Sequence, residues 1–115
     1  MGLELDFADE RLEQCRKLFC ETGITLAALA VVRKREVTVQ DACKDIARYT
    51  ADTMNLGETQ MARELDDLER QGYVGRKGDR FHITVKGKNF MFAMLKVWNT
   101  YVDAMNNLWG CYYGA

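Results

Sequence analysis

The sequence predicts a mostly α-helical domain that carries one small β-hairpin. Apolar side chains recur at three- and four-residue steps over most of the chain, which is typical of amphipathic helices. Two short β-rich runs flank a turn at Lys77-Gly78-Asp79, as in a hairpin. The chain has no Pro and 48% of its residues are apolar, so long helices are easily accommodated and disorder is not expected.

The length of 115 residues predicts a single domain over residues 1–115, with a modest core that is marginal for an isolated monomer. We expect three parts. An N-terminal helix covers 1–22, a central three-helix and hairpin core covers 24–85, and a long C-terminal helix covers 86–113.

The first half of the chain predicts three helices. The first has an apolar stripe and ends near Gly23, since Gly favours helix ends. The second is a short, uniformly apolar helix in TLAALAVVRK, which we expect to be buried. The third starts after Thr38. The stripe of the first helix is Leu5, Ala8, Leu12, Cys15 and Phe19, and that of the third is Val39, Ala42, Cys43, Ile46 and Ala47.

Residues 57–88 have the order of elements that defines a winged helix-turn-helix. A helix over 57–71 packs through Met61, Ala62, Leu65 and Leu68 and stops at Gly72, which supplies a left-handed residue. Tyr73-Val74 and the run from Phe81 to Val85 then read as the strands of the wing.

The last helix, from about Val85 to Trp109, predicts a dimer. Its apolar residues form three adjacent stripes, which cover more than the roughly 100° face that one core contact needs. We therefore expect one side to cover its own domain and the other to meet a second copy, joined by the N-terminal helix. The expected interface residues are Met91, Met94, Trp98, Tyr101, Met105 and Leu108.

The segment ETQMARELDDLERQGYV resembles the recognition helix of the MarR and PadR families of bacterial and archaeal regulators. DRFHITVKGK resembles their second wing strand and the start of their dimerisation helix. The matching positions are Met61, Arg63, Leu65, Asp66, Asp67, Leu68, Glu69, Gly72, Asp79, Arg80, Ile83, Thr84, Gly87 and Lys88. The resemblance implies a homodimeric transcriptional regulator that binds an inverted repeat in double-stranded DNA. The N-terminus lacks a signal-peptide pattern and the cysteines lack CxxC spacing, so we expect a cytoplasmic chain. The wing is short for MarR and nearer to that of PadR.

The expected DNA contacts come from the helix in the major groove and the wing, residues 74–84, on the backbone or in the minor groove. Gln60 suits adenine, and Arg63 suits guanine or phosphate. Phosphate contacts come from basic wing residues and from Lys44 and Arg48. The full expected set on helix and wing is Thr59, Gln60, Arg63, Arg76, Lys77 and Arg80.

The charge of this segment argues against strong DNA binding. The helix carries five carboxylates against only Arg63 and Arg70. The chain as a whole has a net charge of −1, and only residues 31–88, with twelve basic and ten acidic side chains, are positive. Few basic contacts predict weak non-specific binding and a shallow salt dependence. The acidic residues are Glu58, Glu64, Asp66, Asp67 and Glu69.

Other functions and sites have weaker support. No Ser occurs, no glycine-rich phosphate loop is present, and His82, the only His, is expected to face solvent from a wing strand; we expect neither an enzyme nor a cofactor. No ligand spacing suggests a metal site. No signal peptide and no membrane span are expected. Free thiols are expected for the four cysteines, the alternative being a redox switch through Cys15 or Cys111.

Three alternatives remain open at this stage. A small-molecule effector fits where Trp98, Tyr101, Met105 and Trp109 meet the N-terminal helix, although plain interface packing fits the same residues. The chain also fits a winged-helix module that binds protein and not DNA, because fold alone does not fix function. DNA segregation or replication control in a plasmid or phage would use the same DNA-binding face.

Overall fold

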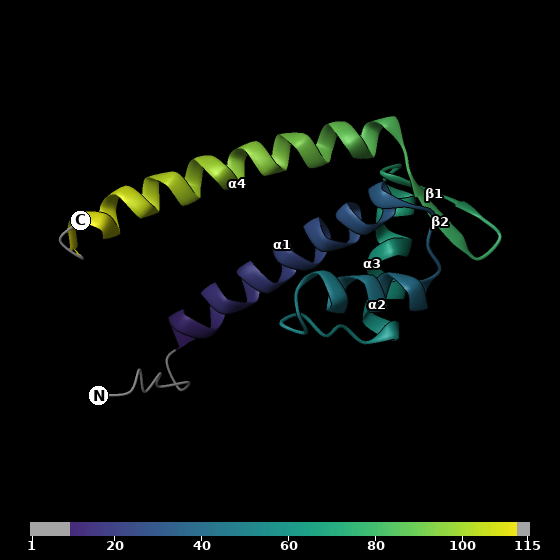
Figure 1. The fold of residues 1–115 in the computed structure, drawn as a ribbon, viewed down its shortest axis with the longest axis horizontal. Coiled ribbons are helices and arrows are strands. Elements are labelled where there is room, and N and C mark those ends of the chain that lie inside the picture. The colour runs from purple at the N-terminus through teal and green to yellow at the C-terminus, as the bar shows by residue number, and fades with distance from the viewer. Residues whose placement is uncertain (1–9, 113–115) are drawn as a thin grey trace.

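The computed structural model describes the backbone of residues 10–112 and the side chains of residues 10–110. It contains four helices and a two-stranded antiparallel hairpin (Figure 1), so the predicted fold class is confirmed. The elements follow the order α1 (Glu10–Lys34), α2 (Val39–Tyr49), α3 (Glu58–Arg70), β1 (Val74–Lys77), β2 (Arg80–Ile83) and α4 (Val85–Tyr112).

Helix α1 is one continuous helix of 25 residues, so the predicted break at Gly23 is wrong. The short apolar helix expected over TLAALAVVRK is its C-terminal half. A Gly inside a helix costs only about 1 kcal/mol relative to Ala. The buried residues Ala28, Leu29, Val31 and Val32 fix that half in the core, which outweighs this cost. Leu5 and Ala8 of the predicted stripe lie outside the described residues.

Helices α2 and α3 both pack on α1. The Thr38 hydroxyl caps α2 by accepting a hydrogen bond of 3.1 Å from the Asp41 backbone N–H, and Ala42 and Ile46 are buried beneath it. The chain leaves α3 through Gly72, whose φ of +83° is the predicted left-handed conformation.

The hairpin is short and is anchored on the core by Phe81. Its strands pair in the register Val74↔Ile83 to Lys77↔Arg80, and Gly78 turns the chain with a φ of +61°. Two backbone hydrogen bonds, of 3.0 and 2.7 Å, join Phe81 to Val37 in the segment before α2.

The second strand ends two residues earlier than predicted. Thr84 starts α4 instead, because its hydroxyl accepts a 3.0 Å hydrogen bond from the Gly87 N–H and donates one of 2.7 Å to the Gly72 carbonyl. A side chain that satisfies a free backbone N–H at a helix start favours the helix over the strand.

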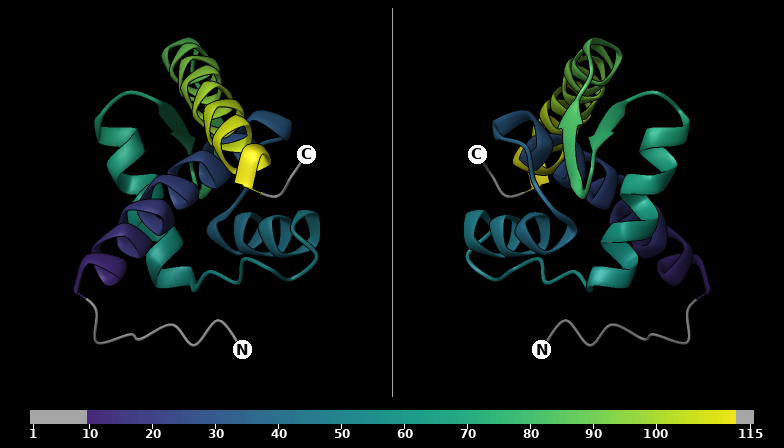
Figure 2. Two further views of the ribbon diagram at one scale, coloured as in Figure 1. Left: turned by 90° about the vertical axis from the view of Figure 1, so that its left-hand side faces the viewer. Right: turned by 90° about the vertical axis from the view of Figure 1, so that its right-hand side faces the viewer.

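Helix α4 spans 28 residues and extends well beyond the core (Figure 1), and the molecule is 51 Å long. It is in contact with α1 and crosses it obliquely (Figure 2). The Phe19 and Trp98 rings join the outer parts of the two helices, edge to face with centroids 6.4 Å apart. The core holds Ala28, Leu29, Val31, Val32, Val37, Ala42, Ile46, Met61, Leu65, Leu68, Val74, Phe81 and Met91.

Candidate nucleic-acid interface

Helix α3 has one buried side and three differently used exposed sides. Met61, Leu65 and Leu68 are at most 3% exposed and fix the helix on the core. Successive residues on a helix are 100° apart, which places the other side chains. One flank, with Gln60, Glu64 and Asp67, turns toward α1, and the opposite flank, with Asp66 and Glu69, turns toward the wing. Thr59, Arg63 and Arg70 point most directly away from the core.

All five carboxylates of α3 have a partner within the chain, which accounts for the acidity of the helix. Glu64 accepts a 2.6 Å hydrogen bond from the Thr25 hydroxyl of α1. Glu58 is 3.5 Å from the amide nitrogen of Gln40 on α2. Asp67 pairs with Arg70 one turn later, and both Asp66 and Glu69 pair with Arg76 of the wing. Four of these acidic groups hold the helix to its neighbours, whereas Asp67 pairs within α3 itself.

Of the four cations on α3 and the wing that are predicted to bind DNA, three form no ion pair among the described residues, and the fourth, Arg76, does. Arg63, Lys77 and Arg80 are exposed, and within residues 10–110 none of them forms an ion pair. Lys77 and Arg80 are register partners on either side of the wing turn. These three side chains are available to a polyanion without breaking an existing pair.

Arg76 differs from the other predicted contacts. Its guanidinium bonds to Asp66, lies 3.3 Å from Glu69 and sits 4.4 Å over the centre of the Phe81 ring. A phosphate would have to compete with two carboxylates and an aromatic face. We call Arg76, Asp66 and Glu69 the wing clamp.

The two further basic candidates lie on α2. Lys44 is exposed and forms no ion pair among the described residues, whereas Arg48 lies 3.6 Å from Asp45 and 4.9 Å over the Tyr49 ring. Only Lys44 is therefore as available as the wing-tip cations.

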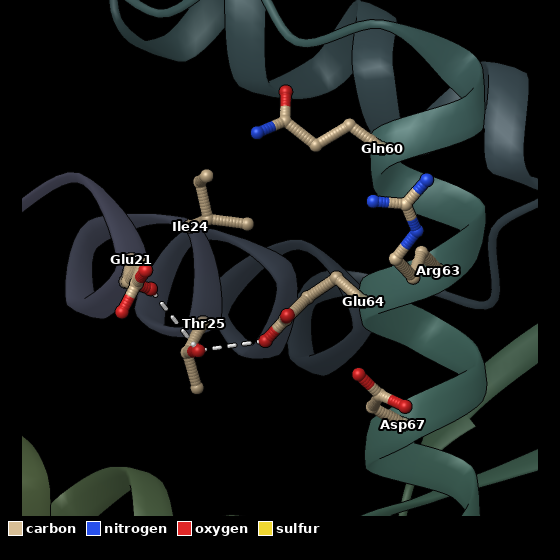
Figure 3. A pocket seen from close by; sticks show the side chains of 7 residues that line it. All are labelled: Glu21, Ile24, Thr25, Gln60, Arg63, Glu64 and Asp67. Atoms are coloured by element: carbon tan, nitrogen blue, oxygen red, sulfur yellow. Dashed lines mark hydrogen bonds between the residues drawn. The ribbon is translucent and has the colours of Figure 1, made fainter. Parts of the chain in front are cut away.

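A cavity of about 380 Å³ lies between α1 and α3, and its lining on α3 is the flank with Gln60, Glu64 and Asp67 together with the neighbouring Arg63. Figure 3 shows Glu21, Ile24 and Thr25 of α1 facing Gln60, Glu64 and Asp67, with the Thr25–Glu64 hydrogen bond crossing between the helices. The structure thus brings Gln60 and Arg63 together but places α1 beside them. Helix α1 therefore bounds Gln60 and Arg63 on one side.

An exposed apolar surface covers the outer parts of α4 and α1. Trp98 is 39% exposed, and Tyr101 and Leu108 are 64% and 66% exposed. Of the predicted interface residues only Met91 lies in the core of its own chain, at 3% exposure, because the start of α4 packs against the hairpin and α1. We call this set the apolar surface: Leu18, Phe19, Phe92, Leu95, Val97, Trp98, Tyr101, Val102, Met105, Leu108 and Trp109.

The sequence predicts that His82 faces solvent, but in the structure its ring is packed within the hairpin. Its ring lies against Gly75, where a Cβ would come within 2.5 Å of the ring nitrogen Nε2. Its Nδ1 is buried and makes no hydrogen bond in the described structure. The register pairs His82 with Gly75 directly across the hairpin, so the small residue makes room for the ring.

The cysteines differ in environment. Cys15 and Cys20 are exposed on α1, and the Arg16 guanidinium lies 3.9 Å from the Cys20 sulfur. Cys43 is partly buried, and its burial, followed by the charge of Glu58, raises the pKa of its thiol. The Cys111 side chain lies outside those described.

Among the side chains of residues 10–110, no group of three His, Cys, Asp or Glu is placed to hold a metal ion. Over residues 10–112 no helix combines the length and apolar character needed to cross a membrane.

Comparison with known proteins supports the fold. No family model and no curated protein matches the sequence. The structure of a transcriptional regulator from Clostridium thermocellum is similar to this one, with a TM-score of 0.66 and 18% sequence identity. The match covers 76% of this chain and 93% of the regulator's chain. The protein smu.1704 from Streptococcus mutans UA159 matches 74% of the chain over 84% of its own, with a TM-score of 0.57 and 22% identity. The chain shares its fold with these two proteins.

Proposed function

We propose that the chain is a DNA-binding transcriptional regulator that acts as a homodimer on an inverted repeat. The observation that carries this proposal is the state of α3. The helix is fixed on the core by Met61, Leu65 and Leu68 and leaves Thr59, Gln60 and Arg63 exposed, with Arg63 free of any described ion pair. The fold shared with a transcriptional regulator supports the same function.

In the proposed complex α3 enters the major groove and the wing lies on the backbone or in the minor groove. Arg63 and Gln60 read bases, and Lys77 and Arg80 contact phosphates. The carboxylates of α3 do not oppose this arrangement as strongly as their number suggests, because each is engaged by a partner within the chain.

A second copy covers the apolar surface in this proposal. Between residues 89 and 112, α4 carries only one basic and one acidic side chain, Lys96 and Asp103, so two copies meet without charge repulsion. Large exposed apolar patches are rare on monomers and mark interaction sites. Two-fold pairing of the chains then presents two α3 helices to the two halves of a palindrome.

DNA binding is tested by fluorescence-anisotropy titration with a random pool of short duplexes near 50 mM salt, followed by sequencing of the bound fraction. We expect enrichment of an inverted repeat, and a loss of affinity on Arg63→Ala of roughly tenfold or more, as for a bidentate base contact. Arg16→Ala, whose partner is Glu13 on the outer part of α1, is the matched control. Absence of binding at this salt concentration, where phosphate contacts are little screened, would contradict the proposal.

The dimer is tested by light scattering coupled to size-exclusion chromatography. Tyr101→Glu and Leu108→Glu place a charge at positions that are about two-thirds exposed in the single chain, so folding is preserved. We expect both variants to elute as monomers. Asn107→Glu, on the polar side of α4, should remain dimeric. A wild-type chain that is monomeric at micromolar concentration would refute this part of the proposal.

A winged-helix module that binds another protein is the second candidate. It is favoured because Arg70 and Arg76 each form an ion pair with a carboxylate of α3, which reduces the number of cations available to DNA. A monomeric wild-type chain that binds no duplex would favour this candidate.

A further inference from the structure

We infer that Arg76 is a positioning residue, which holds the wing at a fixed angle to α3 and does not bind DNA phosphate. Asp66 and Glu69 act in the same unit as the fixed ends of the wing clamp. The DNA part of this inference rests on the proposed function, whereas the part that concerns the wing does not.

Arg76 lies directly across the hairpin from Phe81. Its guanidinium lies 4.4 Å over the Phe81 ring. Phe81 is 2% exposed and is bonded through its backbone to Val37. Arg76 is therefore stacked on a wing residue that is anchored in the core.

The guanidinium of Arg76 is directed at two carboxylates of α3. They belong to Asp66 and Glu69, which lie three residues apart on the wing-side flank of the helix. A planar guanidinium with several N–H donors suits contact with two carboxylates at once. The clamp thus joins the C-terminal half of α3 to β1, and no other ion pair in the described structure links these two elements.

The other arginine of the hairpin, near the wing tip, has a different environment from Arg76. Arg80 lies on the same hairpin, is exposed, and forms no ion pair among residues 10–110. The wing therefore carries two arginines of different character, one held by carboxylates and one open to solvent. Only the open arginine can meet a phosphate without losing an existing partner.

The wing's mobility is measured by amide hydrogen exchange over residues 74–83 in the full chain without DNA. Arg76→Gln and the double variant Asp66→Asn/Glu69→Gln should each accelerate exchange there by roughly two- to fivefold, the range expected for partly exposed ion pairs. Combining all three changes should add little further acceleration, because the changes break the same contacts. Arg80→Gln is the matched control and should leave exchange unchanged. If neither clamp variant changes exchange, the inference is wrong.

DNA binding is then titrated at several salt concentrations with the operator recovered as described above. Arg80→Gln should make the slope of log affinity against log salt less negative by roughly 0.9 per protomer, the value for one phosphate contact. Arg76→Gln should leave the slope unchanged. A change of slope in Arg76→Gln equal to that of Arg80→Gln would overturn the inference.

The acidic double variant separates a positioning role from simple competition. If Asp66 and Glu69 only withheld Arg76 from DNA, neutralising them would tighten binding. We expect equal or weaker binding, since the wing then loses its fixed angle, and tighter binding would overturn the inference. If no duplex binds to the wild type, the proposed function fails, while the exchange measurement still tests the clamp.

Discussion

The Thr25 hydroxyl lies 2.6 Å from a carboxylate oxygen of Glu64, and this hydrogen bond joins α1 to α3 across 39 residues of sequence. The same hydroxyl is 3.2 Å from the Glu21 carbonyl one turn earlier in α1. The bond crosses the cavity beside Gln60 and Arg63 (Figure 3), so it fixes the side of α3 that is proposed to approach DNA.

Replacing Thr25 with Val, which has the same shape without the hydroxyl, should lower the free energy of unfolding by about 1 kcal/mol, the typical net value of such a bond. Chemical denaturation at a fixed protein concentration measures it. Glu64→Gln keeps an acceptor and should cost less than Thr25→Val. Equal stability of Thr25→Val and wild type would show that the bond contributes nothing.

Two glycines should respond in opposite directions to the same substitution. A Cβ on Gly87 would clash with the Tyr73 carbonyl oxygen, so Gly87→Ala forces α4 away from the backbone just before β1 and should cost about 2 to 3 kcal/mol or more. Gly23 has open space around it inside a helix, and Gly23→Ala should stabilise the chain by about 0.5 to 1 kcal/mol. Parallel urea titrations of both variants measure the pair. A destabilising Gly23→Ala would mean that this part of α1 is not helical in solution.

The contact between Arg35 and Asp45 should be important for stability. Asp45 is 5% exposed, and Arg35 donates two hydrogen bonds of 3.1 Å to its carboxylate. Arg35→Met leaves a buried carboxylate with only the more distant Arg48, at 3.6 Å, and should cost about 1 to 3 kcal/mol. Thermal unfolding followed by circular dichroism measures it. Lys44→Met removes an equally long cation from α2 and should be nearly neutral; equal costs would contradict this assignment.

Thiol reactivity should distinguish Cys43 from the exposed cysteines. Burial raises the pKa of the Cys43 thiol, so less of it is ionised at pH 8, and the reactive thiolate is also shielded. In chains that retain a single cysteine, the Cys43 form should react with a disulfide reagent roughly tenfold more slowly than the Cys20 form. Because the pKa of the Cys43 thiol is raised, its rate of reaction with the reagent should continue to increase as the pH is raised above 8. Equal rates at pH 8 would show that the region around α2 opens readily.

The parts of the fold that the sequence predicts correctly are those set by local chemistry. The apolar spacing of Met61, Leu65 and Leu68 fixes the buried side of α3, and Gly72 and Gly78 adopt the left-handed conformations that their turns require. Thr38 caps α2 as a residue before a helix commonly does.

The parts that local pattern could not predict depend on contacts between distant elements. Gly23 has the sequence signal of a helix end, but burial of the following turns keeps α1 continuous. Arg76 has the sequence signal of a phosphate contact, yet it meets Asp66 and Glu69 because the hairpin folds back beside α3. The spacing of Met91 places it in the stripe that is predicted to form the dimer interface. Its position near the start of α4 instead places it in the core of its own chain.

The length of α4 that projects beyond the core has a consequence for every titration of the proposed regulator. A dimer that forms by covering this helix dissociates on dilution, and by mass action the folded, paired species then depends on total protein concentration. At concentrations below its dimer dissociation constant, the chain would have to pair and bind DNA in the same step. Binding curves should then be steeper than a single-site isotherm, and their midpoints should report the affinity of pairing together with that for DNA.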